Sequence, residues 1–154
     1  MEFSETQKKI LEADDPIIFV SSASGSGKTA VLTEKVRQSL QKGKKVVAFT
    51  FTNMAAGEMK KRLCLQNNEN IFIGTIHSYC TTLLLQKGIT EAIKYINDEQ
   101  FDKLFYLMEK HPECRPDIDI CLCDEAQDSN EIQLKFILLC VIKLKVVFIF
   151  YVEY

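Results

Sequence analysis

A loop of small residues is the first segment whose residue types could do chemistry. It runs from Ser22 to Thr29 (Ser-Ala-Ser-Gly-Ser-Gly-Lys-Thr), between the apolar run Ile17–Val20 and a helical pattern over Ala30–Gln41. Glycines let backbone N–H groups surround a phosphate at the positive end of a helix dipole. Lys28 would then pair with the β- and γ-phosphates, and the Thr29 hydroxyl would hold Mg²⁺. The order of strand, loop and helix predicts a phosphate-binding loop, although Ser22 stands at its first glycine position. A plain turn of small residues is the alternative.

Two neighbouring carboxylates form the second candidate site. Asp124 and Glu125 directly follow the apolar run Ile118–Cys123. A buried parallel strand would bring them to the carboxyl edge of a sheet, beside the phosphate loop. Asp124 is suited to bind Mg²⁺, and Glu125 is a candidate base for an attacking water. The alternative is an acidic helix N-terminus, where the helix dipole favours carboxylates.

Short apolar runs that alternate with helical patterns must position these groups. Such alternation is typical of βαβ units with a parallel sheet that is buried on both faces, so we predict an α/β fold. The predicted strands are Ile17–Val20, Val46–Phe49, Ile71–Ile73, Ile118–Cys123 and Val146–Tyr151. About six helices are expected between them. Their predicted N-terminal caps are Ser4 (with Gln7 in a capping box), Asn53, Asp98 and Ser129, and their predicted C-terminal glycines are Gly43 and Gly88.

Composition sets further bounds. The 154 residues suit one globular domain, and 19 Lys and Arg against 21 Asp and Glu give a net charge of -2. No overall positive field attracts nucleic acid, so a nucleic-acid surface would have to be local. Three lysines interrupt the apolar stretch near the C-terminus, which argues against a membrane span. No signal peptide opens the sequence, so we expect reduced cysteines and a cytoplasmic rather than a secreted protein.

Four sequence blocks together resemble the UvrD/Rep-type superfamily 1 DNA helicases. The Ser22–Thr29 loop resembles their motif I, Thr50–Arg62 closely resembles motif Ia, and Asp124-Glu125-Ala126-Gln127-Asp128 looks like motif II. Gly74-Thr75-Ile76-His77-Ser78 resembles the Gly-Thr-aromatic-His-Ser block that lies between them. Gln7 fits the adenine-reading Q motif. The resemblance spans nearly the whole chain.

This resemblance implies a P-loop NTPase (RecA-like) three-layer fold with a mainly parallel five-stranded sheet, ATP and Mg²⁺ as cofactors, and single-stranded DNA as a partner. The implied catalytic residues are Lys28, Asp124, Glu125 and Gln127, with Thr29 and Asp124 at the metal and Gln127 sensing the γ-phosphate. The implied nucleotide-binding residues are Gln7, Ser24, Gly25, Ser26, Gly27, Lys28, Thr29 and Ala30. The implied DNA-binding residues are Phe51, Thr52, Asn53, His77 and Ser78.

Several of these residues have a plainer alternative. Phe51 could belong to the core, and Asn53 could serve only as a helix cap. Gln7 could only complete the capping box of Ser4, and His77 could be a satisfied histidine at a helix start.

Two departures from the helicase pattern shape the functional expectation. Only 45 residues, 79 to 123, separate Ser78 from Asp124, and residues 79–117 are interpreted as a shortened insertion. The predicted last strand runs into Phe150-Tyr151-Val152-Glu153-Tyr154 instead of a Gly-Asp motif. We therefore interpret residues 1–154 as a single RecA-like ATP-binding domain without the C-terminal helicase domain.

The resulting expectation is a motor domain that couples ATP hydrolysis to 3′ to 5′ translocation on single-stranded DNA. Its activity alone would be weak, because an arginine finger is typically worth about 10³–10⁵ in rate and the second domain would supply the arginines. A second polypeptide could supply that domain, and no membrane is involved. The alternative is a non-catalytic nucleotide- or DNA-binding remnant or subunit that partners another protein.

Overall fold

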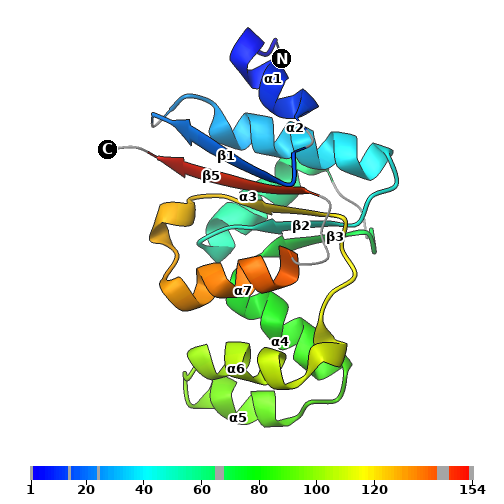
Figure 1. Ribbon diagram of the computed structural model, residues 1–154, viewed down its shortest axis with the longest axis vertical. Helices are drawn as coiled ribbons and strands as arrows, with labels where there is room; N and C mark the ends of the chain where they lie inside the picture. The colour runs from blue at the N-terminus through cyan, green and yellow to red at the C-terminus, as the bar shows by residue number, and fades with distance from the viewer. Residues whose placement is uncertain (1, 14, 24, 65–67, 142–145, 153–154) are drawn as a thin grey trace.

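The protein is an α/β domain built on one parallel sheet. The computed structural model describes residues 2–13, 15–23, 25–64, 68–141 and 146–152. Its strands are β1 (Ile17–Ser22), β2 (Val46–Phe49), β3 (Ile71–Gly74), β4 (Ile120–Cys123) and β5 (Val146–Val152). They lie in the order β1-β5-β4-β2-β3, and every neighbouring pair is parallel (Figure 1). The predicted α/β class with a parallel sheet is confirmed.

Helices connect the strands on both faces of the sheet. They are α1 (Glu5–Glu12), α2 (Lys28–Gln41), α3 (Asn53–Leu63), α4 (Ile76–Gln86), α5 (Glu91–Asn97), α6 (Asp102–Lys110) and α7 (Glu131–Val141). Two short 3₁₀ turns, η1 (Pro112–Cys114) and η2 (Ala126–Asp128), precede and follow β4. None of the helices in the described ranges has both the length and the apolar character that crossing a membrane requires.

The sheet separates two hydrophobic cores because alternate residues of a strand point to opposite faces. Val46 and Ala48 of β2 belong to the core that contains Leu32 and Val36 of α2. Val47 and Phe49 belong to the core that contains residues of α4, α6 and α7. Thus α1, α2 and α3 cover one face, while α4 to α7 lie on the other (Figure 1).

Three of the four predicted helix caps need correction, and one is confirmed. The capping box of Ser4 and Gln7 is present at the start of α1. The N-cap of α3 is Thr52 rather than Asn53: its backbone is extended and its hydroxyl accepts a hydrogen bond from the Ala55 N–H at 3.1 Å. Asn53 is already the first helical residue, so the prediction was wrong by one position.

The other two starts are displaced because a local signal competed with the cap. Asp98 caps the C-terminus of α5, and α6 begins only at Asp102. Asn130, not Ser129, caps α7, because the Asn130 side chain accepts from the Gln133 N–H at 2.9 Å and the Gln133 side chain accepts from the Asn130 N–H at 3.0 Å. Gly43 and Gly88 follow the C-caps of α2 and α4 with left-handed φ values of 70° and 75°, as predicted.

Candidate functional site

The phosphate loop connects β1 to α2 at the carboxyl edge of the sheet. The N-cap of α2 is Gly27, whose φ of 86° lies in the left-handed region that favours glycine. Because glycine has no side chain, no capping side chain occupies this helix start, and an anion can take that place. Lys28 is the first helical residue and is buried, and Thr29 and Ala30 follow in the same turn. Ser24 lies outside the described residues.

Gln7 reaches this loop from α1. Its Nε2 donates to the Ser26 carbonyl at 3.2 Å, and a Cβ added at Gly27 would lie 3.1 Å from the same nitrogen. Its Oε1 accepts from the Ser4 N–H at 2.9 Å, so the capping role and the contact with the loop coexist. An amide has two donor hydrogens and two acceptor lone pairs, so Gln7 keeps one of each for a planar ligand. A cavity of about 190 Å³ lies beside Gln7 and is also lined by Ser26 and Lys28.

Asp124 faces the phosphate loop from the end of β4. Its backbone N–H donates to the Phe49 carbonyl at 2.9 Å, which continues the pairing of β4 with β2. Burial raises the pKa of Asp124, and the charge of Glu125 acts in the same direction. The Glu125 N–H, at 3.1 Å from Oδ1, and the charge of Lys28 oppose this rise. Lys28 and Asp124 therefore share one electrostatic site.

The donor set fits Mg²⁺. Magnesium in nucleotide sites is held by one or two carboxylates together with phosphate oxygens and water. Asp124 and the hydroxyl of Thr29, next to Lys28, are groups of that kind. Among the residues that the structure describes, no group of three His, Cys, Asp or Glu side chains could form a protein-only metal site.

Glu125 has a strained backbone at the position where a catalytic base is predicted. Its φ is 51° and its ψ is 47°, a left-handed conformation that costs a non-glycine residue about 1–3 kcal/mol. Its carboxylate accepts a hydrogen bond from Gln127 Nε2, so the two side chains predicted to serve hydrolysis contact each other. Such strain clusters at active sites, where surrounding structure holds the side chain in place.

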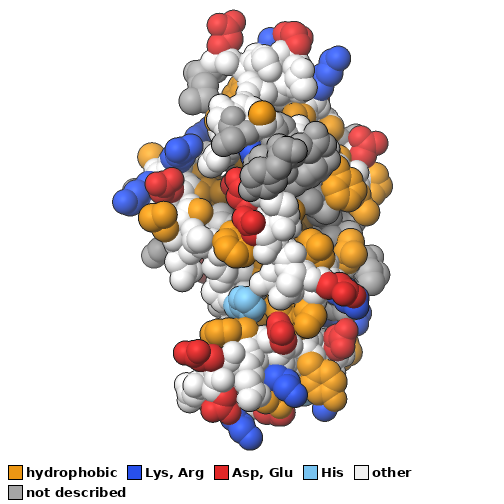
Figure 2. Space-filling model, turned by 90° about the vertical axis from the view of Figure 1, so that its left-hand side faces the viewer, with side chains coloured by type: hydrophobic (Ala, Val, Ile, Leu, Met, Phe, Trp, Pro, Cys, Tyr) orange, Lys and Arg blue, Asp and Glu red, His pale blue; other side chains and the backbone are white. Residues whose placement is uncertain are grey.

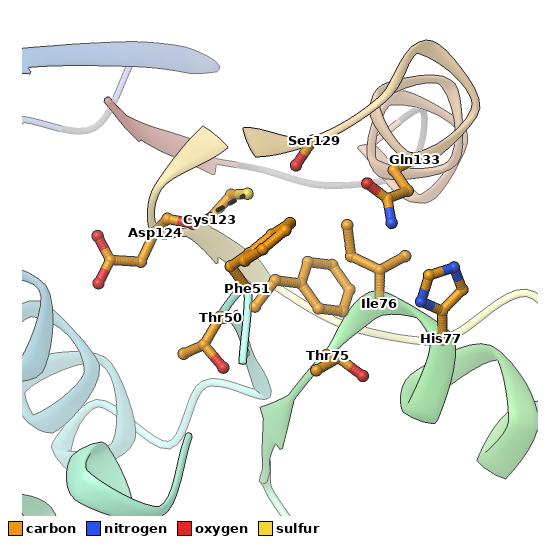
Figure 3. Close-up of a pocket in the computed structure, with 10 residues that line it drawn as sticks. Thr50, Phe51, Thr75, Ile76, His77, Cys123, Asp124, Ser129 and Gln133 are labelled. Atoms are coloured by element: carbon orange, nitrogen blue, oxygen red, sulfur yellow. Dashed lines mark hydrogen bonds between the residues drawn. The ribbon is translucent and has the colours of Figure 1, made fainter. Parts of the chain in front are cut away.

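A second cavity of about 280 Å³ opens where β2, β3 and β4 end (Figure 3). Asp124 lies at one side of it, with its carboxylate directed away from Phe51, while Gln133 and His77 lie at the other (Figure 3). Phe51 is 54% exposed, so the core alternative for this residue is wrong. The cavity joins the end of the strand that carries Asp124 to the exposed ring of Phe51.

Thr52, Asn53 and Ser78 are placed beside this cavity but do not line it. The Thr52 hydroxyl is engaged as the N-cap of α3, and exposed Asn53 follows it. Ser78 Oγ donates to the Thr75 carbonyl at 2.8 Å within the first turn of α4. A Cβ at Gly74 would lie 2.8 Å from Phe72 Cζ and 2.9 Å from Ser78 Oγ. Gly74, Thr75 and Ser78 thus have a structural reason for their identities, the tight passage from β3 into α4.

His77 is half-buried in the first turn of α4, between the cavity and α6. Its ring centroid is 5.1 Å from that of Phe101 and 5.4 Å from that of Phe105. Burial lowers the pKa of His77, and the charge of Asp102 opposes this shift only in part. His77 is therefore an uncharged aromatic group at neutral pH.

Sequence reasoning gave no role to four residues that line the second cavity. They are Thr50, Thr75, Ser129 and Gln133. Gln133 had a recognisable signal, because its spacing from Asn130 is that of a capping box. Cys123 also lines the cavity, but burial raises its pKa to about 12, so its thiol is not a nucleophile at neutral pH.

The edge at which the strands end carries mixed charge. Figure 2 views this edge and shows acidic and basic side chains intermingled, with hydrophobic side chains between them. The net charge of -2 agrees with this distribution. A nucleic acid would be held here by individual contacts rather than by a broad positive surface.

Comparison with known proteins identifies the family. Residues 3–112 match the UvrD/REP helicase N-terminal domain. The chain belongs to this family. Its matched region contains the phosphate loop, Gln7 and the cavity residues of β2 and α4.

Individual relatives of the UvrD/REP family agree. The chain is 39% identical over 86 residues to a "Probable DNA helicase II homolog" of Mycoplasma capricolum subsp. capricolum, covering 51% of this chain and 12% of that protein. It is 38% identical over 86 residues to DNA helicase II of Rickettsia typhi, covering 53% of this chain and 13% of that protein. It is 32% identical over 108 residues to an ATP-dependent helicase/nuclease protein of Pediococcus pentosaceus, covering 54% of this chain and 9% of that protein. The match thus spans about an eighth or less of each relative.

Proposed function

We propose that this chain is the ATP-binding motor domain of a UvrD-like DNA helicase, with a RecA-like three-layer P-loop fold. Such a domain couples ATP hydrolysis to movement along single-stranded DNA, in the 3′ to 5′ direction that the resemblance implies. The observation that carries the proposal is the convergence of Gln7, Lys28 and Asp124 at the carboxyl edge of the sheet. The family membership and the names of the relatives support it.

Nucleotide binding would use the phosphate loop and α1. The first turn of α2 would face the phosphates, with the Lys28 ammonium as a point charge beside them. Gln7 would present its remaining donor and acceptor to the edge of the adenine ring. Mg²⁺, when bound with ATP, would neutralise phosphate charge, and Thr29 and Asp124 are the residues that would hold it.

Hydrolysis would depend on Glu125 and Gln127. A carboxylate within hydrogen-bond reach of the attacking water can accept its proton. The hydrogen bond from Gln127 orients the Glu125 carboxylate, and a γ-phosphate that attracts Gln127 would change this contact. Gln127 would in this way report the nucleotide state to the base.

The DNA strand would lie along the second cavity. The exposed ring of Phe51 can stack on any base, which gives sequence-tolerant binding. Thr52, Asn53, His77 and Ser78 are the remaining residues of the proposed track. Because Asp124 and Phe51 line the same cavity, a change at the nucleotide can reach the strand over a short path.

Efficient turnover would require a second domain, in the same polypeptide or supplied by another one. An arginine that stabilises the charge of the transition state typically adds about 10³–10⁵ to the rate, and the resemblance places such arginines on the second RecA-like domain. The domain alone would bind ATP and hydrolyse it slowly. A non-catalytic binding module remains the second candidate, since the mixed charge and the half-open cavity also suit binding without turnover.

The deciding experiment is ATP turnover with and without single-stranded DNA, compared with Glu125→Gln. Stimulation by DNA that Glu125→Gln removes would support the motor domain. ATP binding without turnover in either protein would support the binding module.

Nucleotide binding itself is tested by Lys28→Ala. We expect affinity for Mg-ATP to fall at least tenfold, because loss of one charge-assisted contact to phosphate costs about 1.5–3 kcal/mol. Titration with a fluorescent ATP analogue measures the change, and Lys9→Ala on the exposed surface of α1 is the control. Equal affinities in the wild type and Lys28→Ala would refute the phosphate-loop assignment.

A further inference from the structure

A third cavity adjoins the proposed DNA track. It has a volume of about 420 Å³ and lies between the start of α4, the start of α6 and the residue that caps α7. His77 lines both this cavity and the one that contains Phe51. The two cavities therefore continue into each other past one half-buried imidazole ring.

Phe101 is the aromatic residue that this third cavity exposes. It is 38% exposed, whereas Leu104, Phe105, Leu107 and Met108 supply the buried side of α6. Its ring lies against His77 at a centroid distance of 5.1 Å and an interplanar angle of 46°. Phe101 thus offers an exposed aromatic surface whose position is fixed from behind.

A series of buried rings holds this surface in place. His77 also contacts Phe105, whose centroid is 5.4 Å from that of Phe136. Phe136 in turn lies 6.5 Å from Phe49, which lines the cavity of Phe51. The same packed rings therefore support both cavities, so the surfaces of Phe51 and Phe101 are held on one rigid body.

We propose that Phe101 and His77 form a second base-binding position, which takes a base of the same single strand that stacks on Phe51. This inference rests on the proposed function, because it extends the DNA track. It also assigns a role to the segment 79–117, which carries none of the quoted helicase blocks.

The charges around the third cavity favour a base over a phosphate as its ligand. Glu99 and Asp102 line it together with a single lysine, Lys103. Two carboxylates disfavour a phosphate, whereas Gln100 and Asn130 can donate to or accept from the edge of a base. The sugar-phosphate backbone would then lie outward, in solvent.

The chain has no tryptophan, which allows a direct test. Phe101→Trp introduces a single indole at the proposed position, and a base that stacks on it should quench its fluorescence. Phe51→Trp reports on the first position of the track. Tyr106→Trp is the matched control, because Tyr106 lies on the same helix, is 49% exposed and does not line either cavity.

We expect an oligothymidine to quench Phe51→Trp and Phe101→Trp but not Tyr106→Trp, and an abasic strand of equal length to quench none of them. We also expect Phe101→Ala to weaken binding of that oligothymidine about fivefold or more, since stacking of one base contributes at least this much. Thermal unfolding must show that each variant is folded.

The outcomes separate this inference from the proposed function. Quenching of Phe51→Trp without quenching of Phe101→Trp would overturn the second position and leave the track intact. Quenching of neither would overturn the track, and the second position with it. Equal quenching of Phe101→Trp and Tyr106→Trp would show nonspecific contact and would also overturn the second position.

Discussion

At the scale of single residues, environment decides what each candidate side chain can do. Gln7 serves as a cap and as a contact of the phosphate loop with the same amide. Asp124 carries an acid that burial makes weaker, and His77 carries a base that burial makes weaker. Both shifts disfavour the charged form, so each residue places part of its stability under the control of pH.

Asp124→Asn is expected to raise stability and abolish Mg-dependent nucleotide binding. Burial disfavours the ionised carboxylate, so a neutral amide of similar shape should fold more favourably at pH 7. We expect the unfolding midpoint to rise by roughly 2–4 °C, the shift that about 1 kcal/mol produces in a chain of this size. Differential scanning fluorimetry with and without Mg-ATP measures both effects.

The sign of the pH dependence provides the control for that prediction. Because the folded pKa of Asp124 lies above its unfolded value, this residue's contribution to stability grows as the pH falls through the folded pKa. The advantage of Asp124→Asn should therefore shrink in acid. A lower midpoint for the variant at pH 7 would contradict the assigned cost of burial.

His77 is expected to make the protein less stable in mild acid. Its folded pKa lies below 6.5, so the unfolded chain binds the proton more tightly, and stability present at higher pH is lost as the pH falls through that range. Asp102 is the carboxylate that faces the ring and limits the loss. Between pH 7.5 and pH 5.5, we expect wild type to lose roughly 2–4 °C more than His77→Phe, about 1 kcal/mol. Parallel losses in the two proteins would remove His77 as the cause.

At the scale of elements, helix starts build the edge that carries the site. Thr52 caps α3, Thr75 caps α4, and Gly27 leaves the start of α2 without a capping side chain. The first two starts are closed by a hydroxyl, whereas the third is open to an anion. The difference between a structural helix start and a binding helix start is thus visible within one sheet edge.

Thr52→Ala and Asn53→Ala form a matched pair that tests the corrected cap. Thr52→Ala leaves the Ala55 N–H without its partner, and we expect a loss of about 1 kcal/mol. Asn53→Ala changes an exposed first-turn residue, and we expect a change within about 0.5 kcal/mol. Urea unfolding of both variants measures the difference. A larger loss in Asn53→Ala would restore Asn53 as the cap.

At the scale of the whole molecule, charge and shape together predict how a strand is held. The edge that carries the cavities shows mixed charge (Figure 2), and Lys103 is the only lysine or arginine among the described residues lining the cavities of Phe51 and Phe101. The affinity of the domain for DNA should therefore come from stacking more than from counterion release.

The salt dependence of oligonucleotide binding tests this expectation. Each phosphate contact of a single strand contributes a slope of about -0.7 to the logarithm of affinity against the logarithm of salt, so we expect a slope of about -0.7 to -1.4. Fluorescence anisotropy of a labelled oligothymidine at several salt concentrations gives the value. A much steeper slope would place the strand over the basic last turn of α3, which carries Lys60, Lys61 and Arg62.

The sequence by itself determined the locally encoded parts of this protein. The β2 boundaries, the capping box of Ser4 and the glycines after α2 and α4 were predicted because each depends on residues close together in the chain. The starts of α6 and α7 were not, since Asp98 and Ser129 have the chemistry of a cap but neighbouring residues took that position. The residue types of the phosphate loop and of Asp124-Glu125 were likewise readable as local patterns.

Only the tertiary structure decided which of these parts meet. The contact of Gln7 with Ser26, the charge of Lys28 acting on Asp124 and the packing of His77 on Phe101 all join separate elements. They depend on strand order and on which helix covers which face, and no local pattern encodes either. Exposure was decided in the same way: Phe51 and Phe105 are the same residue type, but the fold leaves one ring in solvent and buries the other.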